Sequence, residues 1–119
     1  MNVALWVVQG VLAAVFLASG SAKLVMSKER MIASGQTGVA PFPLPVIRLT
    51  AAAEILAAFG LVLPEATGVA EVLTPLAALA LAVVMVGAAA SHRSLREYPQ
   101  VRLNALLFLA AVLVALGRF

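Results

Sequence analysis

Four apolar runs, each long enough to cross a lipid bilayer, dominate the sequence and leave only short polar connections between them. They cover about residues 3–23, 46–63, 66–90 and 101–117. A helix needs roughly 20 apolar residues to cross a hydrocarbon core about 30 Å thick. Because the backbone finds no water there, such spans fold as helices. The runs therefore predict an integral membrane protein of the all-α class, with a single membrane domain over residues 1–119.

The composition agrees with a chain that lies in lipid. Hydrophobic residues make up 64% of the sequence and charged residues 11%, and the mean hydropathy is +1.11. A soluble domain averages about 45 to 50% apolar and about 25% charged residues, and a chain this short could not bury so much apolar surface in one core. The lipid bilayer is therefore an expected partner. The eight Lys and Arg residues form no basic stripe, so nucleic acid is not an expected partner.

Two of the runs allow an alternative interpretation. The first could be a cleaved signal peptide ending near Ala22, but residues 1–4 carry no basic side chain, and the run exceeds the usual apolar length of about 7 to 15 residues. An uncleaved span is favoured. In the third run, Pro75 either kinks a span or starts the helix behind Thr74 as N-cap. A start there leaves only about 22 Å of helix before Ala90, so a kinked span is expected.

Short connections make successive helices antiparallel neighbours, which predicts an up-down bundle of four helices. The first connection, residues 23–45, fits a short interfacial helix followed by a Gly- and Pro-rich re-entry loop. Basic residues gather in the first and third connections and the adjoining helix ends: Lys23, Lys28, Arg30, Arg48, Arg93, Arg96 and Arg102. The positive-inside rule places these connections in the cytoplasm and both termini outside. Arg48 and Arg102 are expected to act as interfacial anchors.

Glu54 is the polar residue that the predicted bundle must accommodate, because it falls near the middle of the second span. A carboxylate at that depth costs on the order of 3 kcal/mol on insertion scales, so it usually faces the bundle interior. Arg48 is a poor partner, since six positions on one helix put the two side chains about 120° apart. Lys23 on the first span can reach toward Glu54, whereas a protonated Glu54 could instead bond to a neutral polar residue.

The expected polar centre therefore comprises Glu54 with Lys23, Ser19, Asn104 and, toward the outer side, Gln9. Its role is either a structural clasp of the bundle or a site for a proton or a polar ligand group such as a quinone carbonyl. Other candidates carry less weight: a solvated helix-end acid is expected at Glu71 and a surface residue at His92. No metal-ligand cluster, nucleophile with a base or phosphate loop occurs in the sequence, and there is no cysteine. No metal is therefore expected.

Several stretches resemble the DoxX-like family of small four-helix bacterial membrane proteins. They are SGSAKL at Ser19–Leu24, the Gly-Pro-rich entry to the second span, AAAEILAAFGLVLP around Glu54 and RLNALLFLAAVLVALGRF at the C-terminus. The resemblance implies a four-helix bundle in a bacterial cytoplasmic membrane, with Lys23 and Glu54 at the recurrent polar positions. The family takes its name from a subunit of a thiosulfate:quinone oxidoreductase, and other members are linked to redox stress.

Three functions are compatible with these features. The first is a non-catalytic accessory subunit that stabilises a larger membrane complex and packs against its other subunits. The small size and the small-residue stripe of Gly10, Ala14, Ala18 and Ala22 favour it. The second is a quinone-linked oxidoreductase subunit, with quinone as the one candidate cofactor; the missing cysteines and cofactor ligands argue against catalysis by this chain alone. A carrier or proton conductor is the third, although four spans are few for a transporter.

Overall fold

The computed structural model describes residues 2–119, with Met1 outside the described residues. The helices are α1 (Asn2–Val25), α2 (Lys28–Ala33), the 3₁₀ helix η1 (Thr37–Val39), α3 (Leu44–Gly60), α4 (Leu63–Thr67), α5 (Leu73–Ser94) and α6 (Tyr98–Arg118). Four segments are long and apolar enough to cross a membrane: α1, α3 with α4, α5, and α6. Residues 2–119 contain no strand. The prediction of an all-α fold with four membrane-spanning helices is confirmed.

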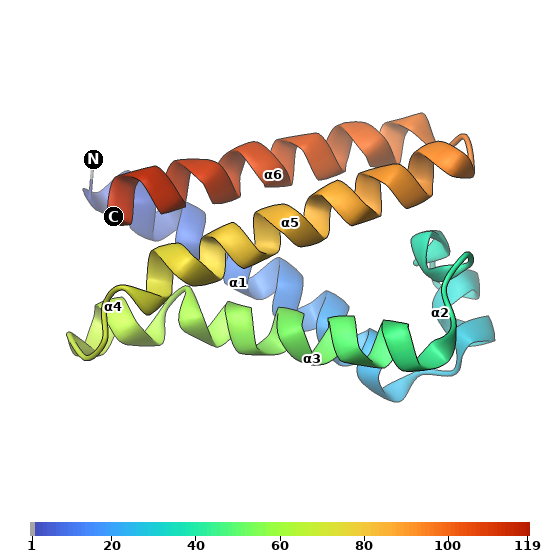
Figure 1. The fold of residues 1–119 in the computed structure, drawn as a ribbon, viewed down its shortest axis with the longest axis horizontal. Coiled ribbons are helices and arrows are strands. Elements are labelled where there is room, and N and C mark those ends of the chain that lie inside the picture. The colour runs from blue at the N-terminus through green and yellow to red at the C-terminus, as the bar shows by residue number, and fades with distance from the viewer. Residues whose placement is uncertain (1) are drawn as a thin grey trace.

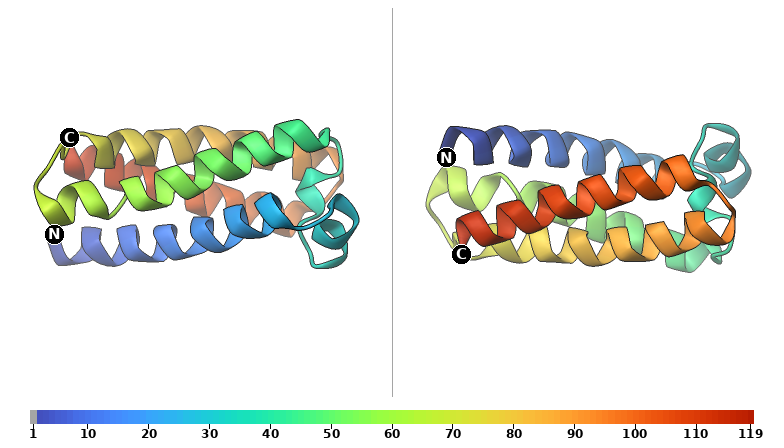
Figure 2. Two further views of the ribbon diagram at one scale, coloured as in Figure 1. Left: turned by 90° about the horizontal axis from the view of Figure 1, so that it is seen from below. Right: turned by 90° about the horizontal axis from the view of Figure 1, so that it is seen from above.

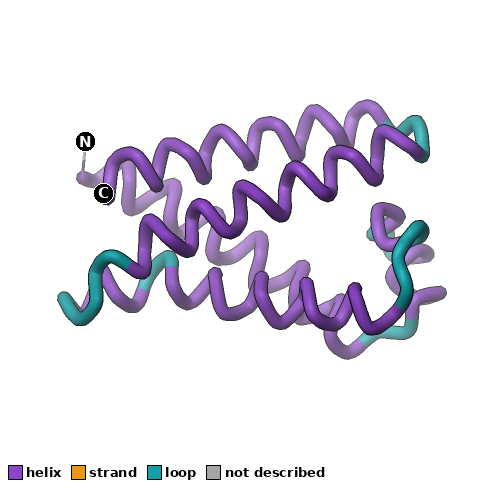
Figure 3. The backbone as a smooth tube through the Cα atoms, in the orientation of Figure 1, coloured by secondary structure: helices purple, strands orange, loops and turns teal. Residues whose placement is uncertain are grey.

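The four long helices run antiparallel along a bundle about 40 Å in length (Figure 1). α1 packs mainly against α3, and α5 packs mainly against α6, so the bundle consists of two helical hairpins. Figure 2 shows the two marked chain ends together at one end of the bundle, with α2 at the other. The loops lie at these two ends (Figure 3). The α5–α6 connection shares the end that carries α2, as expected for an up-down arrangement.

A compact apolar core holds the two hairpins together. Its largest members are Leu12 and Phe16 from α1, Leu61 after α3, Leu81 from α5 and Val114 from α6. The outward faces are apolar as well, and exposed side chains include Val3, Val7, Val11, Leu49, Leu56, Val83, Leu106, Leu109 and Leu116. A helix that is apolar on all sides belongs in a lipid environment rather than in water. The chain is thus a multi-pass membrane protein.

α1 and α3 approach each other closely at Gly20. A Cβ atom on Gly20 would lie 2.9 Å from Cγ1 of Ile55 and 3.0 Å from the carbonyl oxygen of Ala51. Only a residue without a side chain leaves room for this contact. The predicted stripe of small residues does not make the contact, because Gly10, Ala14 and Ala18 are exposed.

The expected proline-kinked span over residues 66–90 is wrong. α4 ends at Thr67, where Gly68 adopts a left-handed conformation with φ of 70°, and α5 begins at Leu73. Pro75 lies in the first turn of α5, where its missing N–H breaks no helical hydrogen bond.

Two further features of α5 differ from the sequence-based expectation. The hydroxyl of Thr74 donates to the carbonyl oxygen of Gly60 at 3.0 Å. Thr74 therefore satisfies a carbonyl at the end of α3 and does not act as the N-cap of α5. α5 also continues to Ser94, and its 22 residues span about 33 Å. The helix therefore does not need the residues before Leu73 to cross the bilayer.

The connections contain more helix than the sequence suggested. α2 forms as predicted, and the side chain of Ser27 caps it by accepting from the backbone N–H of Arg30 at 3.2 Å. The re-entry loop after α2 includes η1. α6 begins at Tyr98, three residues before its predicted start, because Pro99 fits the first turn of a helix.

Candidate functional site

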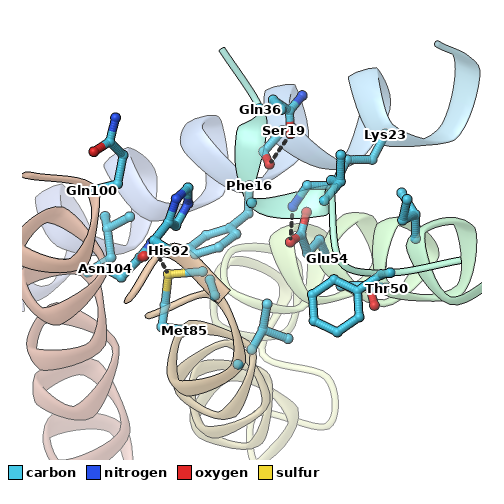
Figure 4. Close-up of a pocket in the computed structure, with 18 of the residues that line it drawn as sticks. Phe16, Ser19, Lys23, Gln36, Thr50, Glu54, Met85, His92, Gln100 and Asn104 are labelled. Atoms are coloured by element: carbon cyan, nitrogen blue, oxygen red, sulfur yellow. Dashed lines mark hydrogen bonds and ion pairs between the residues drawn. The ribbon is translucent and has the colours of Figure 1, made fainter. Parts of the chain in front are cut away.

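A cavity of about 490 Å³ lies between the two hairpins, toward the end that carries α2 (Figure 4). All four long helices and the segment from Gly35 to Phe42 contribute to its wall. Most of the wall is apolar, and its polar members are Ser19, Lys23, Gln36, Thr50, Glu54, His92, Gln100 and Asn104. Small-molecule sites are typically apolar cavities of about 300–1,000 Å³ with a few polar groups. This cavity has both properties.

The main charged feature of the cavity is an ion pair between α1 and α3. Nζ of Lys23 lies 2.9 Å from Oε1 of Glu54, whose side chain is completely buried, whereas the Lys23 side chain is 18% exposed. Gly20 lies one turn before Lys23 and allows the close approach that brings the two groups together. The second carboxylate oxygen, Oε2, is buried and has no hydrogen-bond partner among residues 2–119. The ion pair therefore leaves one acceptor of Glu54 unused.

The two predicted anchors lie apart from Glu54. Arg48 donates from NH1 to the backbone carbonyl of Lys23 at 2.7 Å, so it satisfies a carbonyl in the last turn of α1. Arg102 is exposed, and its Nε lies 3.5 Å from the carbonyl oxygen of Tyr98. Arg48 thus holds the backbone of the residue that pairs with Glu54. Anchoring at the lipid interface remains a prediction for both arginines.

Ser19 and Asn104 line the same cavity as Glu54 without bonding to it. The hydroxyl of Ser19 lies 3.5 Å from Oε1 of Gln36, and Nδ2 of Asn104 lies 3.7 Å from the sulfur of Met85. Oδ1 of Asn104 is buried and has no partner within the described part of the chain. The structure therefore places Lys23, Ser19 and Asn104 around the same cavity as Glu54.

Gln9 is not part of this group. It lies at the opposite end of the bundle, where Nε2 donates to the carbonyl oxygen of Leu61 at 2.6 Å. Arg118 donates to Oε1 of Gln9 at 2.8 Å and to Oδ1 of Asn2 at 2.7 Å, and its Nε lies 3.5 Å from Oε1 of Glu65. We call Arg118, Gln9, Asn2 and Glu65 the Arg118 clasp. It ties α1, α4 and α6 together.

His92 is a cavity residue that the sequence analysis missed. It lines the cavity, its side chain is only 13% exposed, and its Nδ1 lies 2.9 Å from Oε1 of Glu97. The prediction of a surface histidine is wrong because α5 extends four residues beyond Ala90 and carries His92 on its inner face. The spacing of Met85, Ala88 and His92 would have indicated this face if the longer helix had been predicted.

Glu97 connects His92 to η1. The hydroxyl of Thr37 donates to Oε1 of Glu97 at 2.8 Å, beside the contact with His92. The hydrogen bond from Thr37 lowers the pKa of Glu97 below its ordinary value of 4.5, and the hydrogen bond with His92 lowers it further. Glu97 is therefore a carboxylate at neutral pH, and it can only accept hydrogen bonds.

The segment 35–42, which we call the cover segment, closes one side of the cavity. The hydroxyl of Ser91 donates to the carbonyl oxygen of Gly38, and Nζ of Lys28 donates to that of Phe42 at 2.6 Å. Phe42 itself lines the cavity. The predicted re-entry loop is thus part of the candidate site.

Residues 2–119 contain no group of three His, Cys, Asp or Glu side chains placed to hold a metal ion. The polar groups of the cavity instead suit a neutral organic ligand. Lys23 offers N–H donors, while Glu54, His92 and Asn104 offer acceptors. The arrangement can hold an apolar molecule and orient a polar group on it.

No curated protein and no solved structure matches the chain. The model of the DoxX-like family matches residues 7–115, which include every polar residue that lines the cavity. This match confirms the resemblance noted in SGSAKL and in the second and fourth spans. The chain belongs to the DoxX-like family.

Proposed function

We propose that this membrane protein binds a lipid-soluble ring compound, a quinone, in the cavity between its two hairpins. The observation that carries the proposal is the cavity of about 490 Å³, whose largely apolar wall contains the Lys23–Glu54 ion pair. An apolar wall suits a substituted ring, and a few polar groups suffice to orient it.

Lys23 is the group that would recognise a quinone carbonyl. An ammonium group has three N–H donors, and the contact with Oε1 of Glu54 uses one of them. A carbonyl oxygen that accepts a second N–H would leave the ion pair intact. Because the pair lies away from water, such a hydrogen bond is worth more than one at an exposed site.

Two glycines allow a matched test of binding. A Cβ atom at Gly87, which lines the cavity, or at Gly10, which does not, would meet no other residue of 2–119 within 4 Å. Gly87→Leu should therefore fill the cavity without disturbing the bundle, and Gly10→Leu is its control. We expect Gly87→Leu to weaken binding of 2-methyl-1,4-naphthoquinone at least tenfold, measured by equilibrium dialysis with the full chain in lipid nanodiscs.

The control and an ion-pair variant complete this experiment. Gly10→Leu should bind the quinone as the wild type does, and Lys23→Met should bind it more weakly. Circular dichroism and size-exclusion chromatography would establish that each variant is folded. Wild-type protein that binds no quinone, or equal binding by wild type and Gly87→Leu, would refute the proposal.

A role as an accessory subunit of a larger complex is a second candidate, and the exposed stripe of Gly10, Ala14 and Ala18 favours it. Small residues let a helix of another protein approach closely in lipid. Ala14→Trp should then abolish stoichiometric copurification of a partner subunit in mild detergent. Ala105→Trp, at an exposed position on α6, should not. A lone chain under several detergents would count against this role.

The proposal also covers the location of the protein. We place it in a bacterial cytoplasmic membrane with both chain ends outside. The basic residues support this orientation, because Lys28, Arg30, Arg93 and Arg96 belong to the connections at the α2 end of the bundle.

A further inference from the structure

Three hydrogen-bond acceptors belong to residues that line the cavity. Oε2 of Glu54 and Oδ1 of Asn104 are both buried without a partner among residues 2–119. The third is Nε2 of His92, the ring nitrogen that Glu97 does not contact. Buried acceptors in native proteins are nearly always paired with a donor. A donor on a bound ligand would satisfy these acceptors.

Glu97 determines which ring nitrogen of His92 carries the hydrogen in the neutral imidazole. Its carboxylate already accepts a hydrogen bond from Thr37 at 2.8 Å, and it has no proton to give to Nδ1 of His92, 2.9 Å away. Nδ1 must therefore carry the hydrogen and donate it. In a neutral imidazole with the hydrogen on Nδ1, Nε2 holds a lone pair.

Gly38 holds the imidazole ring in this orientation. A Cβ atom on Gly38 would lie 2.8 Å from Nε2 and 3.0 Å from Cε1 of His92, so the backbone of the cover segment lies directly against the ring. The hydroxyl of Ser91, the residue before His92, donates a hydrogen bond to the carbonyl oxygen of Gly38. This bond stabilises the packing of Gly38 against the His92 ring. The ring thus has little freedom to turn Nε2 away.

Figure 4 shows two polar groups in the cavity, with the ring of Phe16 drawn between them. Lys23 and Glu54 lie on one side, and His92 and Asn104 lie on the other. The first group offers both N–H donors and an acceptor. In the second group, the amide nitrogen of Asn104 is directed at the sulfur of Met85, and Oδ1 of Asn104 and Nε2 of a neutral His92 are the acceptors. A ligand needs a donor to bind the second group.

We propose that His92 and Asn104 bind a ring hydroxyl group, so that the cavity prefers the hydroxyl-bearing form of its ligand, a quinol or phenol, over the carbonyl form. This inference rests on the proposed binding of a ring compound and specifies its chemical state. A hydroxyl donates to Nε2 of His92, which a carbonyl oxygen cannot do. A carbonyl oxygen placed against Nε2 of His92 and Oδ1 of Asn104 would receive no hydrogen bond from either atom, and two facing acceptors repel each other.

Three compounds that share a tetramethyl-substituted six-membered ring test this preference. Tetramethylhydroquinone carries two hydroxyl groups, tetramethylbenzoquinone two carbonyls, and the dimethyl ether of the hydroquinone no O–H donor. Their dissociation constants would be measured anaerobically with the full chain in nanodiscs at pH 8. We expect the hydroquinone to bind about tenfold more tightly than either of the others, a difference of about 1.4 kcal/mol.

Substitutions at His92 assign the preference to its Nε2. His92→Phe keeps a ring but removes the acceptor, so the hydroquinone should lose its tenfold advantage while the quinone binds as before. His92→Gln restores an acceptor and should recover part of the advantage. Glu97→Gln should reduce it as well, because Glu97 is a positioning residue that holds the hydrogen on Nδ1.

Each result decides between the two proposals. If none of the three compounds binds, the proposed function and this inference both fail. If the quinone binds as tightly as the hydroquinone or more tightly, the proposed function stands and the hydroxyl preference is refuted. A tenfold preference that survives in His92→Phe would also refute the assignment to His92.

Discussion

Nζ of Lys23 contacts Oε1 of Glu54 at 2.9 Å across the α1–α3 interface. This ion pair joins two helices of the bundle and also forms part of the cavity wall. A single charge at this depth in a membrane is costly, whereas a paired charge is tolerated. Glu54 is completely buried, and the positive charge of Lys23 offsets the cost of burying its carboxylate. The same two residues also line the cavity.

The first prediction concerns this ion pair. Lys23→Met leaves a buried carboxylate without its partner and should reduce the free energy of unfolding by about 3–5 kcal/mol. The double variant Lys23→Met with Glu54→Leu should be more stable than Lys23→Met, because it removes both charges. Urea unfolding in mild detergent, followed by circular dichroism, measures the difference. A double variant less stable than the single one would contradict this account of the pair.

The second prediction concerns the helix contact beside the pair. Gly20→Val should push α1 away from Ile55 and Ala51 and destabilise the protein by about 1–3 kcal/mol. Gly10→Val is the matched control, since a Cβ there meets no atom of another described residue within 4 Å. Melting temperatures of the two variants in one detergent provide the comparison. Equal melting temperatures would show that the close contact at Gly20 contributes nothing to stability.

The third prediction is a pH dependence that arises from Glu97. Its pKa is lowered in the folded protein by the hydrogen bond from Thr37 and by His92. A lowered pKa means that the stabilisation is present above the unfolded value of 4.5 and is lost as the pH falls through the lower folded value. The melting temperature of the wild type should therefore fall between pH 6 and pH 3 more than that of Glu97→Gln. Parallel curves would contradict the prediction.

The fourth prediction concerns the Arg118 clasp. Arg118 is within hydrogen-bonding or ion-pairing distance of Gln9, Asn2 and Glu65, and its guanidinium lies 5.3 Å from the centre of the Trp6 ring. Arg118→Ala should cost about 2–3 kcal/mol, since hydrogen bonds to charged groups contribute about 1.5–3 kcal/mol each and part of the site faces water.

Two further variants control the measurement at Arg118. Arg118→Lys should recover only part of the loss, because an ammonium group cannot reproduce the planar fork of a guanidinium. Arg102→Ala, at an exposed position, should leave the free energy of unfolding unchanged within about 0.5 kcal/mol. Hydrogen exchange at the amides of α4 would report whether the clasp is the contact that was lost.

The fifth prediction concerns membrane orientation, and the absence of cysteine makes it simple to test. Ser34→Cys and Ser94→Cys place an exposed thiol at the α2 end, and Ala66→Cys places one at the opposite end. In intact bacterial cells, a membrane-impermeant maleimide should label only Ala66→Cys. Labelling of the two serine positions instead would reverse the orientation.

The sequence was sufficient to predict the architecture of the bundle. Apolar length identified four spans, and short connections indicated their antiparallel order, because both follow from properties of lipid that act on every residue. The start of α5 was mispredicted for a local reason. Pro75 is compatible with both a kink and a first turn, and the choice depends on Gly68, whose left-handed conformation ends α4.

The candidate site was only partly predictable. The contact between Lys23 and Glu54 was one of two arrangements considered, since a buried acid needs a partner or a proton. Gln9 was assigned to the wrong group, because helix depth does not reveal that Arg118 and Leu61 lie beside it. His92 was missed because the predicted third span ended at Ala90, two residues before it, whereas α5 continues to Ser94.

The two ends of the bundle differ in how firmly they are fastened. At one end the Arg118 clasp joins α1, α4 and α6, while at the other the cavity separates the hairpins and the cover segment bridges them. We therefore expect a change in the spacing of the hairpins to be easier at the cavity end than at the end held by the Arg118 clasp. Molecules of different girth would be accommodated by a small change in the angle between the hairpins rather than by expansion of the whole bundle.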